Sequence, residues 1–328
     1  MEGVEGLRGA AISVIMLTYN REAFISRAVD SVLAQTLRSF EYIIVDNGSS
    51  DRSGVIADAY AAKDSRIRVI HREHGSIGSG RNAGLDMAEG EYITFIDDDD
   101  WCEPDYLEFL YNLAMGNNAE VSICGSANKA FNEKRIMSTE EALMELMWRK
   151  RYTMAFPTKM FSRKLTSYIH FPEGDRFDDI SQMYRLLANS NCIAYHGLPK
   201  YTFYRHPGNT SAWTTAHGLL DSETLDEYLR VQHSRTEWLS ERFPTRSAAW
   251  RYFEWSFMIS MIEKIIRLEI KGCERQHMAM ARELWINQDE FLQCEWIQDF
   301  EKIWVKEYVR YLSSLDMRKS GLISIYEG

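Results

Sequence analysis

The stretch YITFIDDDD, residues 92–100, decides the fold class of this chain of 328 residues. Its first five residues have the length and composition of a buried parallel strand, and four aspartates follow at once. Further strand-like runs lie at residues 12–17, 41–45, 66–70 and 120–124. Helical patterns separate these runs, so the sequence predicts an α/β domain with a mostly parallel sheet flanked by helices.

The strand pattern weakens after residue 126. A capping box at Ser138 and Glu141 predicts a helix that continues to about residue 150, and another helix is expected to end near Asn189. Asn20 and Asp51 are expected to be helix N-caps in the first part of the chain. Beyond residue 213 apolar residues recur every three or four positions, which is typical of helices. We therefore expect two domains, residues 1–212 and an all-helical extension at residues 213–328.

Composition narrows the class of protein. The formal net charge of −10 argues against a nucleic-acid partner, because such binding depends on excess Lys and Arg. The five cysteines are odd in number and form no C-x-x-C pair, which favours a reducing environment. We find neither a signal-peptide pattern nor an apolar run long enough to cross a membrane. The expectation is a cytoplasmic protein, at most peripheral to the inner face of the membrane, with homo-oligomer formation through the helical extension left open.

Polar residues follow three of the predicted strands directly. They are Thr18, Tyr19 and Asn20, then Asp46, Gly48 and Ser50, and then Asp97, Asp98, Asp99 and Asp100. The carboxyl ends of parallel strands meet at one edge of a sheet, and open α/β sheets bind ligands there. We expect these residues to form one nucleotide-sized site.

The four aspartates at residues 97–100 indicate a cation, because adjacent carboxylates repel one another. Oxygen ligands suit Mg²⁺ or Mn²⁺, which in turn hold phosphates. The alternative is a solvated acidic turn before the helix that is expected near Pro104. The position after a buried strand favours metal binding.

A glycine-rich segment at residues 75–84 carries Arg81, which suits contact with a phosphate, although a surface loop would read similarly. The spacing of Gly78, Gly80 and Ala83 also satisfies a dinucleotide-binding fingerprint. That fingerprint belongs directly after the first strand, whereas these residues follow the third. We therefore do not predict a dehydrogenase.

Taken in order, residues 12–20, 45–51, 81–85 and 92–100 resemble the family-2 glycosyltransferases. The resemblance covers about residues 12–212 and is most specific in the first hundred. It implies a Rossmann-like fold of the GT-A type, a nucleotide-sugar donor and inversion at the anomeric carbon.

The resemblance also assigns roles to residues. Thr18, Tyr19 and Asp46 would contact the donor base, commonly uracil in this family, and Arg81 would approach the diphosphate. Asp97 and Asp99 match the D-x-D signature, with Asp97 nearer the ribose and Asp99 the ligand of Mn²⁺ or Mg²⁺. The remaining donor-binding candidates are Asn20, Gly48, Ser50 and Asp98.

The family carries a Glu-Asp pair after a Phe-Pro-x-Gly turn, and the Asp of that pair serves as the base. Here residues 171–174 read FPEG and Asp178-Asp179 follow, so Asp replaces Glu and Asp179 inherits the role of base. The alternative is a surface pair that caps a helix starting near Ile180. His206 is a candidate second metal ligand, and His217 competes with it, although a lone histidine is more often structural.

The resulting expectation is an inverting, metal-dependent glycosyltransferase. It would move a sugar from a nucleotide-sugar, a UDP-sugar by the resemblance, to a hydroxyl of a glycan or other acceptor in surface polysaccharide or glycoconjugate synthesis. Two alternatives remain open. One is a sugar nucleotidyltransferase, against which the sequence after the first strand argues, and the other is a catalytically silent protein that binds nucleotides or glycans.

Overall fold

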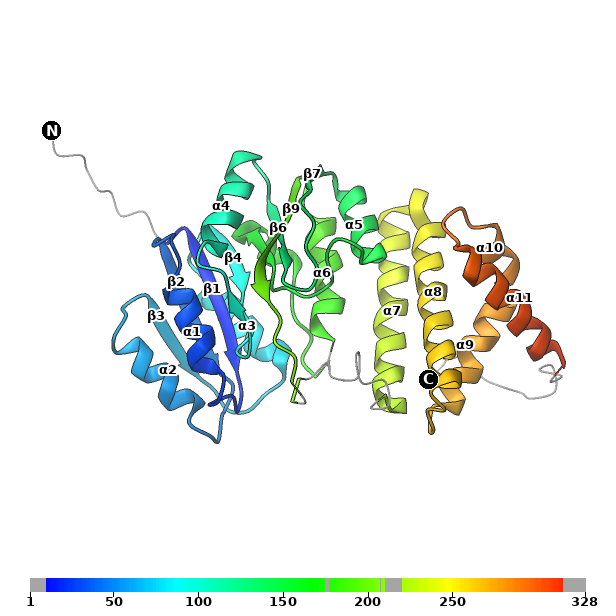
Figure 1. Cartoon of the computed structure of the whole chain (residues 1–328), viewed down its shortest axis with the longest axis horizontal. Coiled ribbons are helices and arrows are strands. Elements are labelled where there is room, and N and C mark those ends of the chain that lie inside the picture. The colour runs from blue at the N-terminus through cyan, green and yellow to red at the C-terminus, as the bar shows by residue number, and fades with distance from the viewer. Residues whose placement is uncertain (1–9, 175–176, 207, 210–219, 315–328) are drawn as a thin grey trace. The chain divides into compact units, whose positions relative to one another are not determined.

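The computed structural model describes residues 10–174, 177–206, 208–209 and 220–314, the last six of these by their backbone alone. The chain divides into two compact units, Met1–Tyr204 and Arg205–Gly328 (Figure 1). The domain boundary expected after residue 212 falls at residues 210–219, outside the described residues.

The first unit is built on one sheet, which contains nine strands among the described residues. They are β1 (Ile12–Thr18), β2 (Phe40–Asp46), β3 (Ile67–His71), β4 (Tyr92–Phe95), β5 (Trp101–Cys102), β6 (Val121–Ser126), β7 (Lys134–Met137), β8 (Lys159–Ser162) and β9 (Ile193–Thr202). Their order is β3-β2-β1-β4-β8-β6-β9-β5, and β7 pairs with β9. β1 to β4 are parallel to one another, while β8 runs antiparallel between β4 and β6. The predicted α/β class is therefore confirmed, and the five expected strands are β1, β2, β3, β4 and β6.

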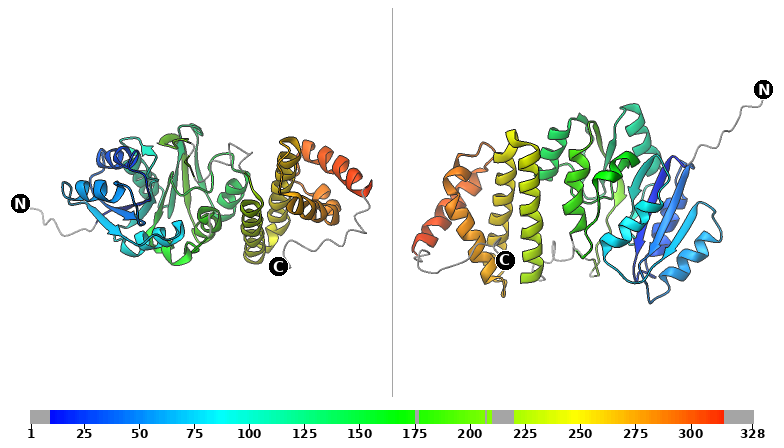
Figure 2. Two further views of the ribbon diagram at one scale, coloured as in Figure 1. Left: turned by 90° about the horizontal axis from the view of Figure 1, so that it is seen from below. Right: turned by 180° about the vertical axis from the view of Figure 1, so that it is seen from behind.

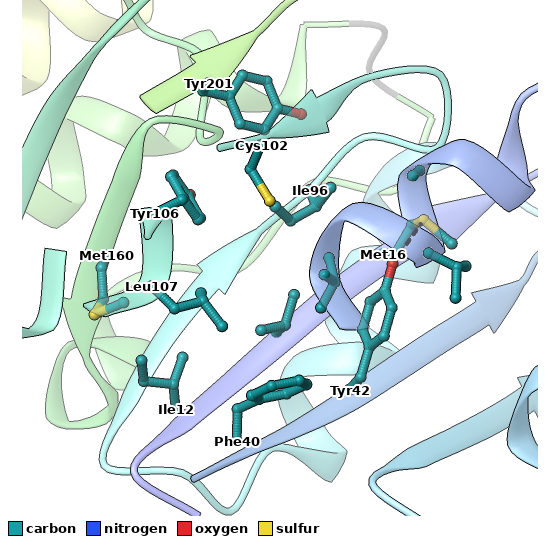
Figure 3. Close-up of a cluster of buried hydrophobic side chains, with 14 of the residues drawn as sticks. Ile12, Met16, Phe40, Tyr42, Ile96, Cys102, Tyr106, Leu107, Met160 and Tyr201 are labelled. Atoms are coloured by element: carbon teal, nitrogen blue, oxygen red, sulfur yellow. Dashed lines mark hydrogen bonds between the residues drawn. The ribbon is translucent and has the colours of Figure 1, made fainter. Parts of the chain in front are cut away.

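Helices cover both faces of this sheet (Figure 2). They are α1 (Ile25–Leu33), α2 (Ser53–Ala61), α3 (Ile77–Met87), α4 (Tyr106–Gly116), α5 (Thr139–Trp148) and α6 (Asp178–Ala188). Ile12, Val14 and Met16, which alternate along β1, belong to one core cluster with the buried face of α1. Tyr42 from β2 joins this cluster, with its hydroxyl 3.2 Å from the sulfur of Met16 (Figure 3).

Glycines bring α3 close to the opposite face of the sheet. A Cβ atom at Gly80 would lie 2.2 Å from the side chain of Leu17, and one at Gly84 would lie 2.5 Å from Ile15. Leu17 and Ile15 are the odd-numbered positions of β1, which point away from α1. The close packing of α3 fixes where its amino end meets the sheet edge.

The described part of the second unit consists of helices and the loops that connect them, as predicted. Its helices are α7 (Ser222–Arg242), α8 (Ser247–Arg267), α9 (Glu274–Ile286), α10 (Gln288–Gln293) and α11 (Asp299–Ser314). Trp250, Tyr252 and Phe291 are among the large side chains buried between them. No helix within residues 10–174, 177–206 or 220–314 is both long enough and apolar enough to cross a membrane.

Local signals at helix starts give a mixed outcome. The capping box of Ser138 and Glu141 is present at the start of α5, as predicted. The prediction that Asn20 caps a helix is wrong, because α1 begins at Ile25 and Asn20 has a left-handed backbone with φ 53°. The prediction that Asp51 is an N-cap is also wrong, because the N-cap of α2 is Arg52; the Asp51 carboxylate, one residue earlier, accepts a hydrogen bond from the Ser53 amide at 2.9 Å.

Candidate active site

The sheet brings the predicted polar groups to one edge. In the parallel register, Thr18 at the end of β1 lies beside Asp46 at the end of β2. The Ile96 amide donates to the Ile15 carbonyl at 3.0 Å, which continues the pairing of β4 with β1 up to the acidic turn at residues 97–100. Three loops therefore leave the sheet side by side.

Asn20, Gly48 and Ser50 shape the loops after β1 and β2. The side-chain oxygen of Asn20 accepts from the amide of Ser50 at 2.8 Å, so one side chain ties the two loops together. Gly48 has φ 81°, and a Cβ atom there would lie 2.5 Å from the backbone nitrogen of His74. The His74 ring stacks on the ring of Tyr19 with centroids 4.1 Å apart. These contacts hold Tyr19 at the surface of the sheet edge, where this residue is 39% exposed.

The acidic turn is largely buried and internally supported. Asp100 is 3% exposed and accepts hydrogen bonds from the hydroxyl of Tyr201 at 2.8 Å and the amide of Tyr204 at 2.7 Å. The Tyr201 hydroxyl also accepts from the amide of Asp97 at 3.1 Å. Burial raises the pKa of Asp98 to about 7 and that of Asp100 to about 8. The turn is therefore an integral part of the fold and not a solvated surface cap.

The carboxylate oxygens of this turn suit a hard divalent cation that is held partly by the protein and partly by the phosphates of a bound nucleotide. The described residues contain no group of three or more His, Cys, Asp or Glu side chains arranged to hold a metal ion. Mg²⁺ is commonly held by only one or two carboxylates together with substrate phosphates and water. A cation bound beside Asp98 and Asp100 would also favour the ionised form of these carboxyl groups, which burial disfavours. Asp99 would be the direct ligand in this arrangement.

Arg81 connects the acidic turn with the pair expected to carry the base. Its guanidinium lies 2.8 Å from the carboxylate of Asp178 and 3.6 Å from that of Asp97. The rings of Phe95, Phe156 and Phe171 surround the guanidinium, with centroids 5.4–5.8 Å from its central carbon. A surface loop, the alternative for the glycine-rich segment, is excluded at this position because Arg81 lies inside α3 with its side chain only 11% exposed.

The Asp178-Asp179 pair begins α6. Asp178 is 3% exposed, so the alternative of a surface pair does not hold for it. Burial raises its pKa to about 7, although Arg81 opposes this shift. Asp179 is half-buried, and its carboxylate accepts from the amide of Ile180 at 3.1 Å. The structure thus places Asp178 against Arg81 and leaves Asp179 the more accessible of the two carboxylates.

Helix α3 also holds the turn that precedes α6. Asn82 donates to the Phe171 carbonyl at 2.9 Å and accepts from the Phe171 amide at 3.0 Å. Gly78, one turn earlier, approaches so closely that a Cβ atom would lie 2.3 Å from the carbonyl oxygen of Pro172. The amino end of α3 therefore sets the position of the segment that leads to Asp179.

Sequence reasoning missed two supporting side chains. Arg27 on α1 donates to the backbone carbonyl of Asp99 at 2.5 Å, and its guanidinium lies over the rings of both Trp101 and Tyr204, 4.2 and 4.4 Å from their centroids. His71 at the end of β3 contacts Asp46 at 3.0 Å. Neither residue belongs to a recognisable motif. The contact of Arg27 with residue 99 depends on how α1 packs on the sheet, and the contact of His71 depends on the register of β3.

The two histidines proposed for the metal have different outcomes. His206 belongs to the second unit, where its amide donates to the side chain of Asn209 at 2.6 Å. Its role as a metal ligand stays a prediction. His217 lies outside the described residues.

Comparison with known proteins gives consistent matches. Residues 13–174 match the family profile described as Glycosyl transferase family 2. The glycosyltransferase GlyG of Streptococcus pneumoniae serotype 4 is 32% identical over 216 residues, which cover 60% of this chain and 72% of GlyG. The family profile spans the three loops at the sheet edge, Arg81 and the FPEG turn.

Solved structures resemble the chain over most of its length. TarS 1-349 of S. aureus in complex with UDP-GlcNAc superposes with a TM-score of 0.59 at 18% identity, over 85% of this chain and 89% of that one. The mannosyltransferase PcManGT of Pyrobaculum calidifontis, in complex with GDP-Man and Mn²⁺, gives a TM-score of 0.55 at 13% identity, over 94% and 87%. At these identities the likeness concerns the fold.

Proposed function

Since the chain belongs to glycosyl transferase family 2 and its first unit has the GT-A type of fold, we propose that it is a sugar-transferring enzyme. In the proposed reaction a sugar moves from a UDP-sugar to a hydroxyl acceptor with inversion. The observation that carries this proposal is the position of Arg81, which contacts Asp97 of the D-x-D signature on one side and Asp178 beside the base candidate on the other. The buried guanidinium of Arg81 therefore links the proposed donor site with the pair that contains the proposed base.

Each residue has a defined task in the proposed reaction. Asp46, Thr18 and Tyr19 receive the nucleobase, Asp97 lies toward the ribose, and Arg81 keeps positive charge near the diphosphate. Asp179 accepts the proton of the acceptor hydroxyl as its oxygen attacks the anomeric carbon from the face opposite the diphosphate. Mn²⁺ or Mg²⁺ bound at Asp99 would neutralise the negative charge of the departing diphosphate. We place the acceptor among glycans, in surface polysaccharide or glycoconjugate synthesis.

A thermal-shift panel tests the donor class and the metal together. Nucleotide-sugars with different bases are added with Mn²⁺ or with EDTA, and the midpoint of unfolding is measured. A specific donor stabilises the native state by mass action, about 2.7 kcal/mol at a hundredfold excess over Kd. We expect the largest shift with UDP-sugars and Mn²⁺ and a smaller one with EDTA. Equal shifts for all bases, or none that depends on the metal, would contradict the proposal.

A further inference from the structure

The carboxylate assigned to the nucleobase is held by a histidine that the sequence did not single out. The parallel register of β2 and β3 pairs Asp46 with His71, so both side chains point to the same face of the sheet. The Nδ1 atom of His71 lies 3.0 Å from Oδ2 of Asp46, and its Nε2 atom lies 3.0 Å from Oδ1 of Asp58 on α2. The imidazole thus bridges two carboxylates from different elements.

The packing around this bridge is close on the side of Asp46. The Asp46 side chain is 8% exposed, and its second oxygen accepts from the Ser49 amide at 3.0 Å. Gly54 of α2 packs directly on the contact, since a Cβ atom there would lie 2.4 Å from Oδ2 of Asp46 and 3.2 Å from the His71 ring. The absence of a side chain at residue 54 lets α2 bring Asp58 within reach of the ring.

We propose that His71 is a positioning residue for donor binding: Asp58 orients its ring, and the ring holds the Asp46 carboxylate in place to accept the ring N–H of a base such as uracil. This role rests on the proposed function, because it presupposes that Asp46 receives the nucleobase. The His71 and Asp58 side chains are 50% and 58% exposed, and in this role both act through the buried Asp46 carboxylate.

The bridge needs a proton on both ring nitrogens. The hydrogen bonds that the ring donates to Asp58 and, second in size, to Asp46 raise the pKa of His71 above its ordinary value, and burial opposes this only in part. These two carboxylates, from α2 and β2, are the charged groups in hydrogen-bond contact with the ring. A neutral imidazole donates from one nitrogen only, so one carboxylate loses its donor as pH rises through the pKa of His71. We therefore expect donor binding to weaken as pH rises through that raised pKa.

Variants at His71 test this role directly. UDP affinity by calorimetry, and donor KM and kcat, are measured between pH 5.5 and 9 for the unchanged protein, His71→Leu and His71→Gln. Leu offers no donor, so Kd and KM should rise on the order of tenfold or more at low pH, the usual effect of losing a hydrogen bond to a charged group, while kcat changes little. Gln offers an amide donor that does not titrate. The Kd and KM of His71→Gln should therefore lie between those of the unchanged protein and His71→Leu, and they should depend less on pH.

Two Asp→Asn variants separate this role from a general loss of stability. Asp58→Asn removes the carboxylate that contributes most to the raised pKa of His71, so the inflection in UDP affinity should move to lower pH. Asp64→Asn is the matched control. It removes a carboxylate that pairs with Arg66 at 2.6 Å, just before β3 begins, at the end of the strand opposite His71. Both the UDP affinity and the pH of its inflection should stay unchanged in this variant.

The outcomes distinguish the two levels of the proposal. UDP binding that depends on Asp46 but has the same affinity and pH profile in His71→Leu as in the unchanged protein would overturn the role of His71 alone. Failure of the unchanged protein to bind any nucleotide would overturn both this role and the proposed function.

Discussion

At the scale of single residues, Asp178 and Asp179 are adjacent in sequence but differ in environment. Asp178 is 3% exposed, lies 2.8 Å from Arg81, and has its pKa raised to about 7 by burial. Asp179 is half-buried and keeps a more accessible carboxylate at the first turn of α6. A carboxylate that abstracts a proton from an acceptor must be reachable, so the structure favours Asp179 as base and Asp178 as the partner of Arg81.

Replacing the base should separate catalysis from binding. In Asp179→Asn the general base is lost while the donor contacts remain, so kcat should fall by about 10²- to 10⁴-fold. UDP affinity, measured by calorimetry, should stay within a factor of about three. The control is Asp30→Asn on α1, which removes a carboxylate that accepts a hydrogen bond from the Tyr60 hydroxyl at 2.8 Å. This variant should retain full turnover. Turnover near the unchanged level in Asp179→Asn would show that another group takes the proton.

At the scale of elements, α3 serves both sides of the site. Gly80 and Gly84 lie against β1, Arg81 and Asn82 lie at the middle of the helix, and Gly78 lies near its amino end; Gly78 and Asn82 contact the FPEG turn. Because one helix makes all of these contacts, the packing of α3 positions both Arg81 and the FPEG turn relative to the sheet edge.

A methyl group at residue 78 should disturb catalysis more than binding. Gly78→Ala places a Cβ atom 2.3 Å from the carbonyl oxygen of Pro172, so the turn must shift, and we expect this shift to displace Asp179. A misplacement of about 1 Å in a reacting group can cost on the order of a hundredfold in rate, and we expect kcat to fall toward that extent. Donor KM should change less than kcat.

The control for this change is Gly116→Ala at the end of α4, where an added Cβ atom meets no atom within 4 Å. It should leave kcat unchanged. Equal kinetics for the two variants would argue against a role of α3 in positioning Asp179.

The elements that the sequence predicted well are those with uniform burial. β1, β2 and β4 are buried parallel strands whose residues are mostly apolar, and the polar clusters that follow them are local in sequence. β8 and β9 were not predicted. β8 contains Lys159 and Ser162, both buried, and β9 is interrupted by Gly197 and Pro199, so neither shows a strand period. The contacts of Arg27 and His71 depend on register and helix packing, which a single sequence does not display.

At the scale of the whole molecule, one buried charge opposes folding. Lys159 in β8 is fully buried, and its ammonium donates to the Ala155 carbonyl at 2.6 Å. Burial lowers its pKa to about 7, whereas a lysine in an unfolded chain has a pKa of about 10.4. The unfolded state therefore binds the proton more readily, and this residue makes the protein less stable as pH falls from about 10 to about 7.

Lys159→Met should reveal this effect. Methionine has a similar length without the charge, so the variant should be the more stable protein at pH 7.5, and the difference should shrink as pH rises toward 10. Urea denaturation across that range gives the free energy of unfolding of both proteins. The same change at exposed Lys164 is the control and should not alter the pH profile. A difference that stays constant with pH would contradict the lowered pKa of Lys159.

The residues of the proposed reaction and the family match lie in the first unit. The sheet, the acidic turn, Arg81 and the Asp178-Asp179 pair all lie in Met1–Tyr204, and the family match at residues 13–174 lies within the same unit. The central claim is that a divalent cation at Asp99 and a nucleoside diphosphate bind together at the carboxyl edge of this sheet. Asp99→Asn removes one of four crowded carboxylates and should not impair folding.

The most direct test is a calorimetric titration of UDP into the unchanged protein and into Asp99→Asn, each with and without Mn²⁺. The account predicts that Mn²⁺ strengthens UDP binding to the unchanged protein and has little effect on the variant. UDP binding that is equally strengthened by Mn²⁺ in both proteins, or in neither, would contradict it.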